Sequence, residues 1–230
     1  MKTSKKQQEI NKSFDINKIY TLGEALNILK VAPKANFDES VDVCINLNVD
    51  PKKVTQPIRG TVSLPHGTGK SVKVCVICKG EHETKAQEAG ADTVGSEELI
   101  AKIASGWTDF DVCVSTPEMM RHMAKLGKIL GPKGLMPNPK TGTVTQDVAT
   151  AVKEIKAGKI EYKMDKIAGI HVGVGKLSID IAKMEENVKD FISTVISSNA
   201  EVSKTNAIKA IFIAKTMGPG LRLDLSEFKK

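Results

Sequence analysis

Two kinds of β-strand follow one another along this chain, and their order limits the folds it can adopt. Residues 41–50 alternate between apolar and polar side chains without a break, which is the period of a strand with one face in water. The same alternation recurs over residues 58–64, 159–164 and 170–174. From Val72 onwards, short and uniformly apolar strands are instead separated by helical segments, which indicates a parallel α/β sheet. The chain therefore combines two architectures.

These two architectures predict how the chain divides into domains. Because the strands before residue 65 resemble those after residue 160, we predict that both ends build one α+β domain, from residues 1–66 and 160–230. The predicted insertion, residues 67–159, is a Rossmann-like, three-layer α/β domain, so the overall class is α/β. A pair of chain crossings between two domains is typical of a hinge.

Capping residues mark several helix ends. Thr21 and Glu24 have the spacing of a capping box, which opens a helix that ends before Pro33. Thr116, with proline after it, is predicted to open a second helix, and Asp147 a third. Further helices are predicted near residues 83–89, 97–105 and 179–198, and further strands at 72–78, 110–115, 206–215 and 221–225.

No segment is suited to a membrane or to export. The longest apolar runs, such as residues 210–214, are far below the roughly 18 to 20 residues of a membrane helix. Residues 7–12 are mostly polar where a signal peptide has its apolar part, and the start of the chain predicts a loosely held basic arm. We therefore expect a cytoplasmic protein with no membrane partner.

The four cysteines agree with a reducing compartment. Cys75 and Cys78 have C-x-x-C spacing, but residues 72–78 are predicted to form a strand, in which positions i and i+3 point to opposite faces. These two thiols therefore cannot hold one metal ion. The sequence has no second C-x-x-C and its four histidines are scattered, so we predict buried, reduced thiols, no metal and no cofactor.

The net charge of +7 is spread along the chain, but two stretches contain no acid. Residues 119–146 carry Arg121, Lys125, Lys128, Lys133 and Lys140 with no Asp or Glu, and residues 202–223 are also free of acid. Basic loops can follow an irregular phosphate backbone and displace its counterions, which favours a nucleic-acid partner. An ordinary solvated surface would explain the same runs, so charge alone leaves both interpretations open.

Motifs of catalysis and nucleotide binding are incomplete. Residues 67–71, Gly-Thr-Gly-Lys-Ser, resemble the end of a phosphate-binding loop, but Leu64 stands where the first glycine is required, and a strand is predicted to follow. No catalytic triad, zinc-protease motif or carboxylate pair has a plausible partner, which predicts that the chain is not an enzyme. The alternatives are an α/β enzyme that binds a phosphorylated ligand beside Lys70, and a scaffold that docks a protein through its α/β domain.

Two segments rich in proline and glycine are harder to explain as ordinary structure. Residues 130–144 contain three prolines and three glycines, which we expect to exclude a helix. Leu130, Leu135 and Met136 nevertheless predict a loop that folds back on its own domain with its lysines outward. Residues 215–220 present a hydroxyl, amides and a thioether at a tip between two strands, although a plain hairpin turn would also explain them.

Several segments together resemble one family. The run from Leu130 to Val144, L-G-P-K-G-L-M-P-N-P-K-T-G-T-V, is similar to a motif of the ribosomal protein L1 family in its bacterial form. The resemblance extends in order from residue 15 to 225, through residues 36–40, 59–67, 165–171 and 216–218. It implies a structural protein of the large ribosomal subunit whose split domain binds the ribosomal RNA of the mobile stalk. It also implies help in releasing deacylated tRNA from the exit site, and translational repression through the protein's own operon mRNA.

The resemblance also implies an RNA-binding surface on the split domain. Phe37 would pack against a ribose, the tip at residues 216–218 would meet 2′-hydroxyls, and Lys166 would neutralise a phosphate. Six Phe, two Tyr and one Trp supply little base stacking, so we expect recognition of RNA shape and backbone. The rRNA and mRNA contacts implied by the resemblance are Phe37, Ser40, Asp165, Lys166, Gly169, His171, Thr216, Met217 and Gly218.

The family pattern is not matched everywhere. Asn36, Met164 and Lys215 depart from the residues that are common in the family, which predicts an altered hydrogen-bond network around Thr216. The proline-rich motif lies on the inserted domain, apart from the surface implied for rRNA. Its exposed lysines, Lys133 and Lys140, are therefore candidates for tRNA or secondary RNA contacts.

Overall fold

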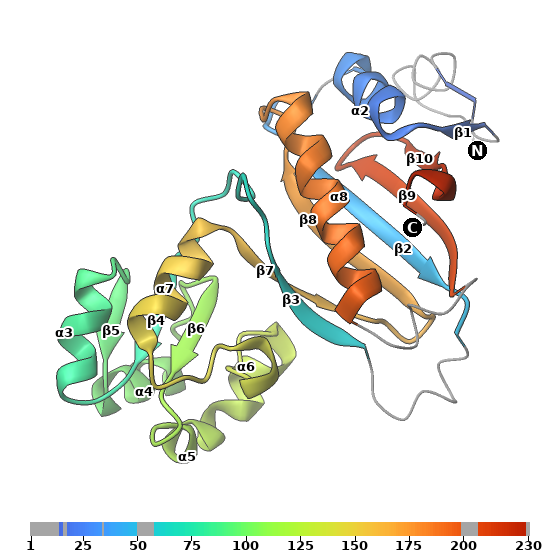
Figure 1. Ribbon diagram of the computed structural model, residues 1–230. Helices are drawn as coiled ribbons and strands as arrows, with labels where there is room; N and C mark the ends of the chain where they lie inside the picture. The colour runs from blue at the N-terminus through green and yellow to red at the C-terminus, as the bar shows by residue number, and fades with distance from the viewer. Residues whose placement is uncertain (1–13, 16–17, 34, 50–57, 199–206, 229–230) are drawn as a thin grey trace. The chain divides into compact units, whose positions relative to one another are not determined.

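In the computed structural model, the chain divides into two compact units (Figure 1). Unit 1 combines residues 1–70 with 161–230, and unit 2 contains residues 71–160. Residues 1–13 of the predicted basic arm and the predicted turn after residue 49 lie outside the described residues. The prediction that the arm is loose as far as residue 20 was wrong, because Ile19–Tyr20 form strand β1, which pairs with β10. The structure describes residues 14–15, 18–33, 35–49, 58–198 and 207–228.

Unit 1 is built on a five-stranded mixed sheet with the strand order β1-β10-β9-β2-β8. β1 runs parallel to β10, and the other neighbours are antiparallel. The predicted alternation is confirmed in β2, where Val41, Val43 and Ile45 are buried while Asp42 and Cys44 are only partly covered. The strands are Ile19–Tyr20 (β1), Ser40–Leu47 (β2), Gly169–Lys176 (β8), Ile208–Lys215 (β9) and Gly220–Leu223 (β10).

Two helices, α2 (Leu22–Val31) and α8 (Ile181–Ser198), cover one face of this sheet (Figure 1). The predicted cap of α2 is confirmed, because the Thr21 hydroxyl accepts a hydrogen bond from the Glu24 amide at 3.4 Å. α8 buries one apolar stripe against the sheet, as its helical periodicity predicts. Among the described residues of unit 1, no helix lies on the other face of the sheet (Figure 1).

β3 (Arg59–Ser63) and β7 (Lys159–Lys163) form a separate two-stranded sheet beside α8. After β3 the chain turns at Gly67, whose φ of 64° suits glycine. It then enters β4 after residue 73 without forming a helix, so the phosphate-binding loop considered for residues 67–71 is not built here. The interpretation as an α/β enzyme that binds a phosphorylated ligand rested on this motif and is therefore not supported.

Unit 2 has a parallel three-stranded sheet in the order β5-β4-β6, with β4 fully buried at its centre. Cys75 belongs to one hydrophobic core and Cys78 to another, so the prediction that these thiols face opposite sides is confirmed. The sheet therefore lies between two helical layers. The elements of unit 2 are β4 (Val74–Ile77), α3 (Glu81–Glu88), β5 (Thr93–Gly95), α4 (Glu97–Ala104), β6 (Val112–Ser115), α5 (Met120–Met123), α6 (Gly127–Lys133) and α7 (Val148–Ala157).

The proline-rich segment contains a helix, so the prediction that it excludes one was wrong. α6 includes Pro132, which lacks an N–H but lies one residue before the helix ends. Gly134 closes the helix in the left-handed conformation, with φ of 71°. Fully buried Leu130 anchors this turn, and Leu135 and Met136 pack on the same core as predicted. Because Pro132 lies in the last turn, it costs little there, and the burial of Leu130 favours the helix.

The prediction that Thr116 caps a helix was also wrong. Thr116 is buried, and its carbonyl accepts hydrogen bonds from the Met119 amide at 3.1 Å and the Ser115 hydroxyl at 3.1 Å. An i to i+3 bond of this kind makes a single tight turn. The α-helix α5 begins only afterwards, at Met120.

Neither a group of metal ligands nor a membrane-spanning helix is found among the described residues. All four cysteines are free thiols. In the part of the chain that the structure describes, no three His, Cys, Asp or Glu side chains gather as metal ligands would. Within the same residues, no helix combines the length and the apolar character needed to cross a membrane.

Candidate nucleic-acid interface

Eight of the nine positions predicted on unit 1 lie in two groups at the two ends of β2. The first group surrounds Ser40, where β2 begins. The second surrounds Gly169, which pairs with Asn46 near the other end of the strand. Asn46 lies six positions after Ser40, which corresponds to about 20 Å along a strand. His171 pairs with Cys44 and lies between the two groups. Together they define an elongated surface rather than a pocket.

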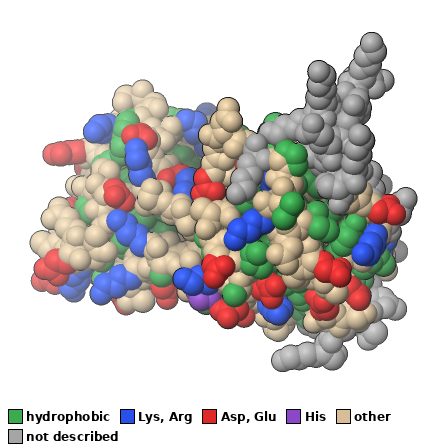
Figure 2. All heavy atoms as spheres, turned by 90° about the horizontal axis from the view of Figure 1, so that it is seen from above, with side chains coloured by type: hydrophobic (Ala, Val, Ile, Leu, Met, Phe, Trp, Pro, Cys, Tyr) green, Lys and Arg blue, Asp and Glu red, His purple; other side chains and the backbone are tan. Residues whose placement is uncertain are grey.

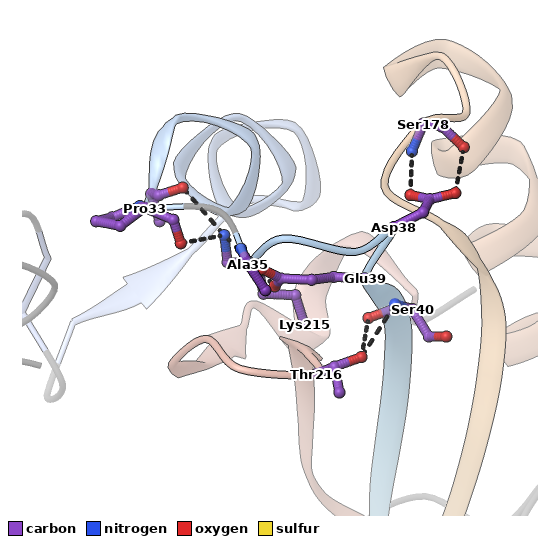
Figure 3. A network of polar contacts seen from close by, with 9 residues as sticks. Pro33, Ala35, Asp38, Glu39, Ser40, Ser178, Lys215 and Thr216 are labelled. Atoms are coloured by element: carbon purple, nitrogen blue, oxygen red, sulfur yellow. Dashed lines mark hydrogen bonds and ion pairs between the residues drawn. The ribbon is translucent and has the colours of Figure 1, made fainter. Parts of the chain in front are cut away.

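The first group is held together by two hydrogen bonds between Thr216 and Ser40, which we call the joint (Figure 3). The Ser40 amide donates to the Thr216 hydroxyl at 3.0 Å, and the Thr216 amide donates to the Ser40 carbonyl at 3.1 Å. Thr216 follows the last residue of β9, and Ser40 is the first residue of β2. The joint therefore fixes the tip at 216–218 against the start of the neighbouring strand.

Asp38 secures the other side of the same group (Figure 3). Its carboxylate accepts hydrogen bonds from the Ser178 amide at 3.2 Å and the Ser178 hydroxyl at 2.8 Å. Phe37 immediately precedes Asp38, and its side chain is 55% exposed. An aromatic ring is thus displayed to solvent beside a residue with a fixed position.

The second group is a tight turn organised by Asp165. The Asp165 carboxylate accepts hydrogen bonds from the amides of Ile167 at 2.9 Å and Gly169 at 2.6 Å. The bond from Gly169, more than any other contact, holds the pKa of Asp165 below its usual value. A Cβ at residue 169 would lie 2.8 Å from Nε2 of His171 and 3.2 Å from Oδ2 of Asp165, so a larger residue there would have to displace the exposed imidazole. Asp165 and Gly169 therefore shape the turn, while Lys166 and His171 are exposed at its surface.

Exposed apolar side chains are concentrated on these loops. Five large hydrophobic residues are exposed in the described part of the chain, and three of them lie in the two groups. Met217 is 60% exposed on the first tip and Ile167 is 86% exposed on the second turn, in addition to Phe37. Apolar side chains held in water by hydrogen-bonded loops are typical of a binding surface.

The uncovered face of the sheet adds residues that the sequence analysis missed. Cys44 pairs with Phe212 on β9, and Phe212 pairs with Arg222 on β10. Directly paired residues point to the same face, so these side chains form a row with His171 across four strands. Arg222 is exposed and Phe212 is half-buried. The acid-free run 202–223 contains both, but strand order was needed to place them beside His171.

Unit 2 presents a separate basic surface. Arg121, Lys125 and Lys128 are exposed at helical spacing on the side opposite the buried residues Met123 and Leu126. The two lysines predicted for secondary contacts lie elsewhere in unit 2. Lys133 Nζ donates to the Thr108 hydroxyl at 2.6 Å, and the Lys140 amide donates to the Asn138 side chain at 3.0 Å. Both remain exposed, as predicted.

Charges of both signs are interspersed on the face shown in Figure 2, where no large area of one sign appears. This agrees with a net charge of +7 spread along the chain. On this face, any contact with a polyanion would involve local basic side chains rather than one large positive field.

A sheet face without a helix, exposed apolar side chains on two loops and basic helical turns are the features of a binding protein. Comparison with known proteins agrees with this class. The model of the Ribosomal protein L1p/L10e family matches residues 28–219.

Individual relatives match nearly the whole chain. The large ribosomal subunit protein uL1 of Protochlamydia amoebophila is 50% identical over 224 residues, which cover 97% of this chain and 95% of that protein. The protein of the same name from Fervidobacterium nodosum is 52% identical over 226 residues, covering 98% and 96%. That of Onion yellows phytoplasma is 52% identical over 224 residues, covering 97% of each.

The chain belongs to the ribosomal protein L1 family. The family is structural and RNA-binding, which confirms the expectation that the chain is not an enzyme.

Proposed function

We propose that unit 1 binds the ribosomal RNA of the mobile stalk of the large subunit, near the exit site of the cytoplasmic ribosome. The observation that carries this proposal is the joint between Ser40 and Thr216, which fixes the tip at 216–218 at the same end of β2 as the segment before Ser40, with Met217 and Phe37 both exposed there. The nine positions named above form the interface. The membership of the chain in a ribosomal protein family supports an rRNA partner.

The contacts follow from the chemistry of each group. Phe37 and Met217 pack on ribose and base faces, where apolar surface is removed from water. The backbone of the tip at 216–218 meets 2′-hydroxyls, which distinguish RNA from DNA. Lys166 neutralises a phosphate beside the turn that Asp165 organises. Recognition therefore reads the shape and backbone of a folded RNA.

The same surface serves for the protein's own operon mRNA. A site that reads shape and backbone accepts any RNA that presents a similar fold. Binding of the mRNA would then compete with binding of rRNA, which is the physical basis of translational repression. A competition assay tests this, since Thr216→Val should weaken binding of both RNAs by the same factor.

Unit 2 contributes to release of deacylated tRNA from the exit site. Arg121, Lys125 and Lys128 form a basic helical face, with Lys133 and Lys140 exposed further along the chain. Phosphates of a tRNA bind such a face without base recognition. Charge reversal at Lys125 and Lys128, or at Lys133 and Lys140, should lower tRNA affinity. Lys153→Glu on α7, which packs on the other core, is the matched control.

The deciding experiment is titration of the full chain with a fragment of the stalk rRNA over a range of salt concentrations. Binding should weaken linearly with the logarithm of salt concentration. Thr216→Val and Met217→Asp should each cost about 1 to 3 kcal/mol of binding free energy. Val31→Asp, which places the same charge at an exposed apolar position outside both groups, should bind like the wild type. An RNA affinity that changes neither with salt concentration nor in the two interface variants would refute the proposal.

A further inference from the structure

A buried ion pair lies directly beneath the interface. Lys215, the last residue of β9, and Glu39, the residue before β2, are both almost completely buried, with 2% and 1% of their surface exposed. Nζ of Lys215 lies 3.6 Å from Oε2 of Glu39. Thr216 and Ser40, which form the joint described above, are the next residues along the chain in each case.

The ammonium group of Lys215 also binds the backbone where α2 ends (Figure 3). It donates hydrogen bonds to the carbonyl oxygens of Ala32 at 3.0 Å and Pro33 at 3.1 Å. The second oxygen of Glu39, Oε1, accepts a hydrogen bond from the Ala35 amide at 2.6 Å. Ala35 and Glu39 lie two residues to either side of Phe37, so the pair fixes the backbone on both sides of the exposed ring.

The alkyl chain of Lys215 supports the other loop. The Gly218 amide donates to the Lys215 carbonyl at 2.9 Å. A Cβ at residue 218 would lie 2.3 Å from Cγ of Lys215, so the tip rests directly on this side chain and requires glycine. One lysine therefore contacts both the tip at 216–218 and the backbone that leads to Phe37.

Stability alone is a poor explanation for such a pair. Removing two charges from water is costly, and well-packed apolar side chains of the same volume often fill such a space at least as well. What an apolar pair cannot do is bind two carbonyls and an amide in fixed directions. The pair thus specifies an arrangement of loops.

We propose that Lys215 and Glu39 are positioning residues of the RNA interface. They hold Phe37 and the tip at 216–218 in one arrangement before RNA arrives, which reduces the ordering cost of binding. Because Lys215 is buried, it touches no phosphate itself. The inference rests on the proposed function of unit 1.

The test compares RNA affinity, its salt dependence and thermal stability in the full chain. The probe is the same stalk rRNA fragment. Lys215→Met keeps the alkyl volume but removes the charge, and it should weaken RNA binding about tenfold, as expected for loss of one positioned contact. The slope of log affinity against log salt should stay unchanged, whereas a lysine that contacts phosphate would reduce it by about one.

A double variant separates positioning from simple destabilisation. Lys215→Met with Glu39→Gln removes the unpaired buried carboxylate, so thermal stability should recover relative to Lys215→Met. Affinity should remain low, because the bonds to Ala32 and Pro33 are still missing. Recovery of affinity together with stability, or a shallower salt slope, would overturn the proposal. If Lys215→Met fails to fold, the RNA affinity and the salt slope of the double variant decide between the two outcomes.

The matched control is the exposed pair of Lys189 and Glu185 on α8, 3.7 Å apart. Lys189→Met should leave RNA affinity unchanged. If Thr216→Val weakens binding while Lys215→Met does not, only the positioning role is wrong. If the wild type fails to bind, or Thr216→Val binds as the wild type does, the proposed interface fails and the positioning role fails with it.

Discussion

The ring of Tyr162 on β7 lies directly over the backbone of Gly60 on β3. A Cβ at residue 60 would stand 2.6 Å from the Tyr162 hydroxyl oxygen and 2.8 Å from the ring carbon that bears it. Tyr162 also packs edge-on against Phe191 of α8, with ring centroids 6.1 Å apart. A side chain at residue 60 therefore cannot be accommodated without moving an aromatic ring of the core.

Gly60→Ala should destabilise unit 1 by about 1 to 3 kcal/mol, because overpacking forces the ring from its position. Urea denaturation of the full chain measures this change. Gly131→Ala is the matched control, since a Cβ there meets no atom within 4 Å and the residue lies inside α6. Its stability should be unchanged or raised by up to about 1 kcal/mol through helix propensity. Equal losses in both variants would contradict the packing argument.

Phe37→Ala should weaken binding to the stalk rRNA by about 1 to 3 kcal/mol, the usual value of one aromatic contact with RNA. Fold stability should hardly change, because the ring is more than half exposed. Fluorescence anisotropy and thermal denaturation measure the two quantities. Val31→Ala removes an 85% exposed apolar side chain outside the interface and should leave both unchanged. Equal affinities for the two variants would exclude a contact through Phe37.

Asp165→Asn should make the protein less stable at neutral pH. The lowered pKa of Asp165 means that its carboxylate contributes stability above the pKa of the unfolded chain, near 3.8, and loses it as pH falls through the lower folded value. The difference between wild type and variant should therefore shrink on acidification toward about pH 2. Urea midpoints measured across this range check the prediction. A constant difference at all pH values would assign the effect to shape rather than charge.

The thiols should react slowly in the folded protein. Burial, together with the charge of Glu83, raises the pKa of Cys78 to about 11. Cys44 is only half-buried, although burial and Asp42 raise its pKa as well. Ellman's reagent at mildly alkaline pH should therefore modify Cys44 first, and all four cysteines only in denaturant. Early modification of Cys78, identified by mass spectrometry, would contradict this order.

Local patterns predicted the elements that depend on local chemistry. Apolar alternation predicted which face of β2 is buried, and the Thr21 hydroxyl predicted the start of α2. The i, i+3 rule placed Cys75 and Cys78 in separate cores. Each of these signals involves only neighbouring residues.

Features that depend on strand order were not predictable in this way. Propensity excluded a helix around Pro132, but burial of Leu130 in a core from distant strands decided otherwise. Phe212 lies in one row with Cys44 and Arg222 because β9 lies between β10 and β2. Lys215 lies in the acid-free run 202–223, where nothing in the local sequence indicates a buried side chain. Its burial depends on Glu39, which reaches it only after the sheet has formed.

The order of strands in unit 1 also determines when this unit can assemble during synthesis. β2 lies between β8 and β9, and β1 pairs with β10. The early strands β1 and β2 therefore cannot complete their pairing until residues 169–223 have been synthesised. Unit 2 is continuous over residues 71–160 and needs no later segment to complete its sheet. Domains fold as units while the chain emerges. The segment inserted in the sequence can therefore fold first, and the proposed RNA surface forms only after the residues of β8, β9 and β10 have been made.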